Sequence, residues 1–157
     1  PLPLEEKLGP DVLVSVPADD KWFDLEVDDD VDPMSIVVSA EYNDRGWKYL
    51  GPKFEGKKTY QVKLVRLGYV RDLAEARTKA DNMGCRLVEG QARESFKAKF
   101  PRPDGKGPVA FGGSEWQNPH GSPHVAYLGV LEGEWPSDFR WSGRGFHDGW
   151  RWLVVGK

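Results

Sequence analysis

The sequence predicts a mixed α+β domain of two helices, short antiparallel strands and long loops, with a small β-rich extension at its N-terminus. The length of 157 residues suits one domain with such an extension. Helical periodicity is confined to residues 72–100. Glycine and tryptophan gather after residue 102, where short strand patterns replace the helical period. We therefore expect an extension over residues 1–56 and a folded module over residues 57–157.

The N-terminal extension is acidic and is punctuated by proline. It holds 14 acidic and 5 basic residues, whereas residues 57–102 hold 12 basic and 5 acidic ones. These oppositely charged parts either pair with each other or form two separate solvated faces. A turn is expected at residues 44–46. Alternating or β-branched apolar residues predict short strands at residues 11–16, 22–27, 35–40 and 47–50.

The next part is predicted to form a strand followed by a helix. Residues 60–65 alternate in the manner of a strand. Asp72 can accept from the first free backbone amides of a helix, and Glu75 completes a capping-box pattern. Gly84 suits the left-handed conformation that ends a helix. The apolar stripe of this helix consists of Leu73, Ala76, Ala80 and Met83.

A second helix is expected over residues 90–100, with Ala92 and Phe96 facing inward and Pro101 ending it. Cys85, between the two helices, is interpreted as a small buried hydrophobe and not as a reactive thiol. It is the only cysteine, which excludes a disulfide within the chain and a multi-cysteine metal site. A single cysteine fits a reducing compartment, and the cellular location stays open.

The last part of the chain is predicted to consist of short strands joined by glycine-rich connections. The final strand should pair with the first strand of the module, so that Trp152–Val155 lies beside Val62–Val65. This closure covers an edge that would otherwise be exposed. The four strands are expected at residues 109–111, 124–128, 138–141 and 151–155.

The sequence contains three patterns that partly match metal or catalytic sites. His120 and His124 are four residues apart, but the prolines around them prevent a helix, and a zinc site in a loop would need a third ligand from residues 147–148. Asp28–Asp32 lacks the glycine that a calcium loop needs at its sixth position. Ser114 lacks the second glycine of the G-x-S-x-G motif. We expect no metal, no cofactor and no catalytic residue.

The strongest functional signal is the mixture of aromatic and polar side chains between residues 114 and 150. Such a mixture is typical of binding surfaces. The alternative is a loop-rich β core whose tryptophans fill space. We predict a display surface at about residues 116–150, anchored by Trp135, Phe146 and Trp150. Its ligand-binding residues are Trp116, Asn118, His120, Tyr127, Trp135, Asp138, Arg140, Ser142, Arg144, Phe146, His147, Asp148 and Trp150.

Short segments of the chain resemble a known family. Residues 83–89 read MGCRLVE, residues 111–116 read FGGSEW, and residues 149–155 read GWRWLVV. Their order resembles the C-type-lectin-fold modules of the formylglycine-generating-enzyme-like type, and within that class the variable proteins of diversity-generating retroelements. The resemblance covers about residues 58–157. It implies a C-type-lectin-like module whose surface is rewritten by a reverse transcriptase just before an unvaried final strand.

The departures from that family narrow the expected chemistry. The enzyme branch depends on a cysteine pair, whereas this chain has Cys85 alone. The calcium-dependent lectins use Glu-Pro-Asn or Gln-Pro-Asp, whereas Gln117-Asn118-Pro119 has another order. We therefore predict a non-catalytic protein that binds a protein or a surface glycan. Two rival hypotheses are a structural or assembly protein of phage or virion type, with the same surface as a subunit interface, and a small enzyme using Glu115, His147 and Asp148.

Composition also bears on other partners. The basic residues lie largely on predicted helix surfaces among carboxylates, without interleaved stacking aromatics, so we expect no nucleic-acid binding. No apolar run approaches the length that spans a bilayer, and no signal-peptide pattern is seen at the start, so we expect no membrane insertion. The oligomeric state stays open.

Overall fold

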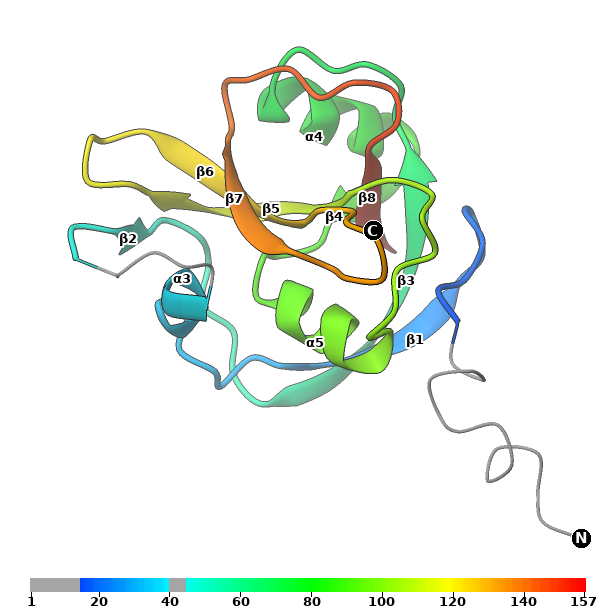
Figure 1. Ribbon diagram of the computed structural model, residues 1–157, viewed down its shortest axis with the longest axis horizontal. Coiled ribbons are helices and arrows are strands. Elements are labelled where there is room, and N and C mark those ends of the chain that lie inside the picture. The colour runs from blue at the N-terminus through cyan, green and yellow to red at the C-terminus, as the bar shows by residue number, and fades with distance from the viewer. Residues whose placement is uncertain (1–14, 40–44) are drawn as a thin grey trace, which may run out of the picture.

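The computed structural model describes residues 15–39 and 45–157, and within them eight strands form one mixed sheet (Figure 1). The strand order is β1-β3-β8-β5-β6-β7, with β2 paired to β5 and β4 paired to β8. The β5–β8 pair is parallel and the other pairs are antiparallel. The strands are β1 (Phe23–Asp28), β2 (Lys48–Tyr49), β3 (Lys57–Arg66), β4 (Cys85–Leu87), β5 (Val109–Gln117), β6 (Pro123–Leu128), β7 (Ser137–Trp141) and β8 (Arg151–Gly156). The helices of this part of the chain are α3 (Ser35–Ser39), α4 (Leu73–Asn82) and α5 (Ala92–Lys99).

The two longer helices cover opposite faces of the sheet (Figure 1). Ala76 of α4 belongs to the same core as Trp152 and Val154 of β8. Phe96 of α5 belongs to a second core, which contains Leu153 of β8. Successive side chains of a strand point to opposite faces, so β8 supplies both cores from one run of apolar residues.

The expected C-type-lectin-like α+β fold, with two helices, short antiparallel strands and long loops, is wrong. Most of the regular structure belongs to the mixed sheet, in which β3 has ten residues and β5 has nine. The pattern at residues 109–111 predicts only the first part of β5, because Gly112 and Gly113 interrupt it. In the structure these glycines are part of β5, which passes close to the backbone of Leu87 and Val88. A side chain at Gly113 would collide with that backbone, so glycine is needed there.

The described part of the N-terminal extension joins the same sheet. β1 confirms the strand expected at residues 22–27 and pairs with β3 over its whole length. The strand expected at residues 47–50 is present as the short β2. Most of the strand expected at residues 11–16, and the first residue of the turn at 44–46, lie outside the described residues. The division of the chain at residue 57 stays a prediction.

The strand expected at residues 35–40 is wrong, because residues 35–39 form the helix α3. The Asp32 carboxylate accepts from the Met34 amide at 3.0 Å, and the Asp32 carbonyl accepts from the Ser35 hydroxyl at 2.7 Å. These bonds start a helical turn, which local propensity alone does not predict for a β-branched run. Ile36 and Val37 are buried in a third core.

The helix predictions for the middle of the chain are confirmed. Asp72 caps α4 by accepting from the Glu75 amide at 2.9 Å. Gly84 has a φ of 74°, as the left-handed stop requires. The last residue of the predicted apolar stripe, Met83, is exposed because it follows the final helical residue. The helix expected over residues 90–100 is present as α5.

The predicted closure of the module is also confirmed. Val62 lies opposite Val155, and Val65 lies opposite Trp152, in the antiparallel β3–β8 pair. Cys85 is buried beside this pair, as expected for a small hydrophobe. An ion pair of 2.9 Å between Asp19 and Arg66 joins the acidic front of the chain to its basic middle. Among the described residues, every helix is too short or too polar to cross a membrane.

Candidate functional site

Burial divides the predicted display residues into two groups. The expectation that Trp135, Phe146 and Trp150 are exposed anchors is wrong, because these rings lie in the interior. Both faces of the sheet are covered, so inward positions of its strands and loops need large side chains. The buried group is Trp116, Trp135, Ser142, Phe146 and Trp150. The partly or fully exposed group is Asn118, His120, Tyr127, Asp138, Arg140, Arg144, His147 and Asp148.

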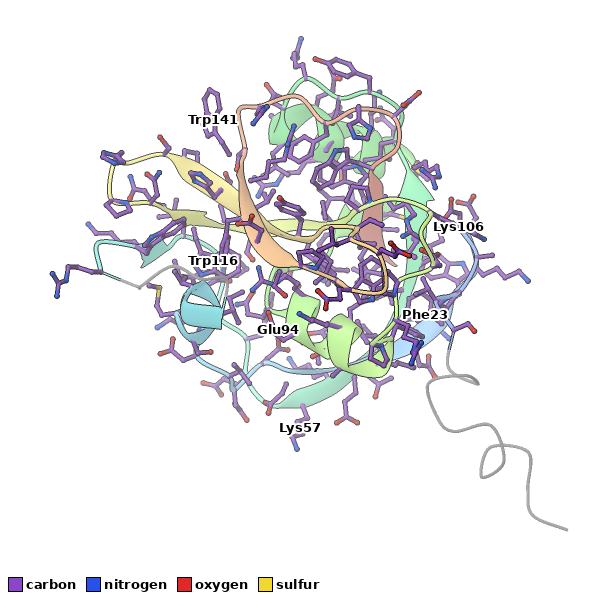
Figure 2. The ribbon with its side chains drawn as sticks, in the orientation of Figure 1. Phe23, Lys57, Glu94, Lys106, Trp116 and Trp141 are labelled. Atoms are coloured by element: carbon purple, nitrogen blue, oxygen red, sulfur yellow. The ribbon has the colours of Figure 1, made fainter. Side chains whose placement is uncertain are left out.

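Trp116 and Trp135 are structural side chains. The indole N–H of Trp116 donates to the Pro33 carbonyl at 3.0 Å, and Figure 2 shows its side chain between the sheet and α3. The indole N–H of Trp135 donates to the carbonyl of Phe100, at the end of α5, at 2.7 Å. A buried tryptophan needs such a partner for its one polar atom. Trp116 therefore holds the segment before α3 against β5, and Trp135 holds the segment before β7 against the end of α5.

The predicted residues that do come together form an arginine–aromatic cluster, which consists of Tyr127, Arg140, Phe146 and Trp150. The Arg140 guanidinium lies 4.9 Å from the ring centre of Phe146 and 5.0 Å from that of Trp150. Trp150 makes edge contacts with Tyr127 and Phe146, each at 5.0 Å between ring centres. Arg140 also donates to the carbonyl of Gly145. The cluster thus joins β6 and β7 to the loop that leads into β8.

The electrostatics of this cluster follow from its partial burial. Burial lowers the pKa of Arg140, and repulsion from the neighbouring Arg144 lowers it further. Burial raises the pKa of Tyr127, and the negative charge of Asp138 raises it further. Tyr127 and Asp138 lie directly opposite each other in the β6–β7 pair. The cluster therefore presents a guanidinium and a neutral phenol at the sheet surface.

Two exposed rings, which were not among the predicted site residues, lie next to the loop that follows β7. Trp141 is 51% exposed and Tyr69 is 61% exposed. Figure 2 shows Trp141 projecting outward from the end of β7. Each ring lies over a glycine, because a Cβ at Gly143 would come within 2.8 Å of the Trp141 ring and one at Gly145 within 2.8 Å of the Tyr69 hydroxyl.

The loop between β7 and β8 is hydrogen-bonded to the segment before α4 and to the first residue of that helix. Val70 and Phe146 exchange two backbone hydrogen bonds of 3.0 and 2.8 Å, and the Leu73 amide donates to the Ser142 carbonyl at 2.9 Å. Figure 1 shows the loop between β7 and β8 passing close to α4. We use the name loop face for the exposed side chains that this arrangement presents, which are Tyr69, Trp141, Arg144, His147 and Asp148.

Asn118 and His120 belong to a different place, the turn between β5 and β6. The Asn118 side chain accepts from the amides of His120 and Ser122, at 3.0 and 2.9 Å, so it stabilises that turn. His124 has its Nδ1 2.9 Å from the Ser122 carbonyl. Across residues 15–39 and 45–157, no three side chains of histidine, cysteine, aspartate or glutamate gather as metal ligands would.

Ser114, the acidic turn and Glu115 also make structural contacts. Ser114 is buried, where its hydroxyl accepts from the Gly90 amide at 2.8 Å and donates to Gln91 at 3.2 Å. In the acidic turn, Asp30 accepts from the Gly56 amide at 2.8 Å and thereby closes the turn onto the segment before β3. Glu115 pairs with Arg77 of α4 at 3.3 Å. Each of these groups therefore holds local structure.

Tyr69 and Trp141 could be found from the sequence only in part. Trp141 lies before the run Ser-Gly-Arg-Gly, whose small residues leave a large neighbouring ring uncovered. Tyr69 carries no comparable signal, because it lies far away in the sequence and is brought to the loop by tertiary contacts such as the Val70–Phe146 bridge. Comparison with models of protein families, with curated proteins and with solved structures finds no match to this chain.

Proposed function

We propose that the protein is a non-catalytic binding protein that takes a protein or a surface glycan as its ligand through the loop face. The observation that carries this proposal is the exposure of Tyr69 and Trp141, which lie next to Gly145 and Gly143 of a loop that also carries three exposed polar side chains. Rigid rings supply contact area at a small cost in conformational entropy. The polar side chains beside them supply adaptable hydrogen bonds.

The structure beneath the loop face supports binding by a surface that is formed in advance. Arg140 lies against Phe146 and Trp150, and Phe146 is bonded to Val70 through the backbone. These contacts hold the loop in one arrangement. A loop that is ordered before the ligand arrives pays less conformational entropy when it binds.

We propose no catalytic step for these residues. His147, which could serve as a base, accepts from the Gly149 amide through Nδ1 at 3.0 Å, so this nitrogen is already engaged. The carboxylate of Glu115 pairs with Arg77. A general base must lie within hydrogen-bond reach of the group that it activates, and these two contacts serve the local backbone and an ion pair.

The test is a screen of the full chain on arrays of glycans and of surface proteins, followed by titration of each ligand found. The double substitution of Trp141→Ala with Arg144→Ala should weaken binding at least about tenfold, because exposed tryptophan and arginine side chains dominate most binding surfaces. The matched control is Trp22→Ala, since Trp22 is 47% exposed but lies beside β1. A ligand that binds both variants equally well uses another surface and contradicts the proposal.

The same variants distinguish free display from assembly. If the protein self-associates in a sedimentation experiment and the double variant dissociates it, the loop face is a subunit interface of a structural or assembly protein. If the protein binds a foreign ligand without self-association, the display proposal stands. Trp22→Ala should change neither measurement.

Diversification by a retroelement is a separate proposal, which rests on the sequence motifs at residues 83–89 and 149–155. The DNA beside the gene should then contain a reverse transcriptase and a near copy of the segment that encodes residues 110–157, with differences at adenines. If the reverse transcriptase or the near copy is absent, diversification is rejected, but the binding proposal is not affected.

A further inference from the structure

A pocket of about 570 Å³ lies apart from the loop face, with which it shares no side chain. This volume is in the range of sites that take small organic molecules, roughly 300 to 1,000 Å³. Its walls come from the second half of α4, from β4, and from the loop before β3. The lining residues are Pro52, Phe54, Arg77, Thr78, Asp81, Cys85, Arg86, Leu87, Glu89, Gly113 and Lys157.

The pocket has an apolar part built from two segments. Cys85 and Leu87 of β4 are buried, and Phe54 and Pro52 come from the loop before β3. A flat apolar molecule placed against Phe54 and Pro52 would remove the exposed carbon atoms of these two side chains from water, which favours binding. An apolar molecular body is therefore the first requirement for an occupant.

The polar part of the pocket brings together three cations from different elements. Arg86 pairs with the buried carboxylate of Glu89, and Lys157 pairs with Asp81. Both of these cations thus have a close carboxylate partner among the lining residues. Arg77 of α4 is the third cation, and its own partners are held less closely.

Arg77 is the cation best placed to receive an anion. Its Nε and Nη2 atoms lie 3.3 and 3.2 Å from the Gly112 carbonyl oxygen, and Nη2 lies 3.3 Å from Glu115. These distances are at or beyond the long end of the usual range, which is about 2.7 to 3.2 Å. A carboxylate or sulfonate could form shorter, charge-assisted bonds with the same guanidinium.

We propose that this pocket is a second binding site, which takes an amphipathic organic anion, with its apolar body against Phe54 and Leu87 and its charged group on Arg77. This occupant satisfies both parts of the pocket at once. The carboxylates of Asp81 and Glu89 are already paired, so they oppose an incoming anion less than free carboxylates would.

The experiment uses two fluorescent probes with the same aromatic skeleton, anilinonaphthalene sulfonate and the uncharged phenylnaphthylamine. The sulfonate should bind the native protein about tenfold more tightly than the neutral probe, since Arg77 favours the charged group. Arg77→Gln should remove that preference while the neutral probe still binds. Thr78→Trp should block both probes by filling the pocket from α4. The control is Ala98→Trp, which adds the same ring at an exposed position of α5, outside the pocket.

The site is located by backbone amide NMR. Saturating sulfonate probe should shift the signals of Gly113 and Cys85 and leave that of Trp141 in place. The proposal is overturned if neither probe binds, if binding survives Thr78→Trp, or if Arg77→Gln leaves the preference for the sulfonate intact. The Arg77→Gln measurement decides the question even if Thr78→Trp does not fold. Shifts at Trp141 instead would assign the probe to the loop face.

Discussion

Arg66 of β3 and Arg151 of β8 lie directly opposite each other, and both guanidinium groups hold the loop that leads into β5. Arg66 donates to the Lys106 carbonyl at 2.6 Å. Arg151, which is fully buried, binds the Asp104 carboxylate through two bonds of 2.7 and 2.8 Å. Two neighbouring strands thereby fix one loop, and several predictions of stability depend on this arrangement.

The Asp104–Arg151 pair should make stability depend on acid pH. Burial raises the pKa of Asp104, but the hydrogen bonds from Arg151 and from the Lys106 amide outweigh it and lower the pKa overall. The folded state therefore binds this proton more weakly than the unfolded state. Its contribution is present above the unfolded pKa of about 3.9 and is lost as the pH falls through the lower, folded pKa.

The measurement is urea unfolding at several values between about pH 7 and about pH 3, for the native protein and Asp104→Asn. At neutral pH the substitution should lower the free energy of unfolding by about 3 to 5 kcal/mol, because it leaves the buried Arg151 unpaired. Its stability should also fall less steeply with acid than that of the native protein. Equal acid profiles would show that Asp104 does not contribute to this dependence.

Gly107→Ala should destabilise the same loop much more than Gly105→Ala. Gly107 has a φ of 128°, and a Cβ there would collide with the Gly149 carbonyl. Gly105 has a φ of 73° and open space around it. We expect a loss of about 1 kcal/mol for Gly105→Ala, from backbone strain alone, and a clearly larger one for Gly107→Ala. Thermal melts of both variants measure the two losses. A larger loss for Gly105→Ala than for Gly107→Ala would contradict the prediction.

Tyr60 should titrate well above the usual range for a tyrosine. Burial, followed by the hydrogen bond that it donates to Asp29 at 2.9 Å, raises its pKa to about 12. Because the folded pKa is raised, this stabilisation is complete below about pH 10 and is lost as the pH rises toward 12. An ultraviolet titration of tyrosinate should lose the step at about pH 12 in Tyr60→Phe. In Asp29→Asn that step should move to lower pH; an unmoved step would count against the hydrogen bond.

Trp150 is buried and Trp141 is exposed, so their replacement by alanine should lower stability by very different amounts. Trp150→Ala should cost about 3 to 5 kcal/mol, because the ring is buried against Tyr127 and Phe146. Trp141→Ala should change stability by no more than about 0.5 kcal/mol, because its ring is largely in solvent. Chemical denaturation of the two variants measures the difference. Similar losses would show that Trp141 is part of the core.

Several elements could be predicted from local sequence because their causes are local. The start of α4 depends on Asp72 and Glu75, and its end depends on Gly84, all within a few residues of the helix. The strands β6 and β8 follow from apolar runs at residues 124–128 and 151–155, each of which is one residue shorter than the observed strand. The pairing of β8 with β3 followed from the need to cover an exposed edge.

Other features depend on partners that are distant in the sequence. Residues 35–39 have the composition of a strand but form α3, whose side chains pack with Trp116. Gly112 and Gly113 read as a strand end, yet they continue β5 past the backbone of Leu87 and Val88. In both places a tertiary contact outweighs the local preference, which amounts to about 1 kcal/mol or less per residue.

The candidate surface shows the same division. Composition was sufficient to indicate that residues 114–150 carry more aromatic rings than an ordinary strand and loop region, and Tyr127, Arg140, Phe146 and Trp150 do gather there. Which rings face solvent could not be read from periodicity. Trp141 has the same strand parity as the buried Phe139, but the sheet ends beside it and nothing covers its position within the described residues. The sequence alone thus determined which side chains the surface can offer and where most segments begin and end. Their exposure was decided by the tertiary structure, because it depends on what distant parts of the chain place against each side chain.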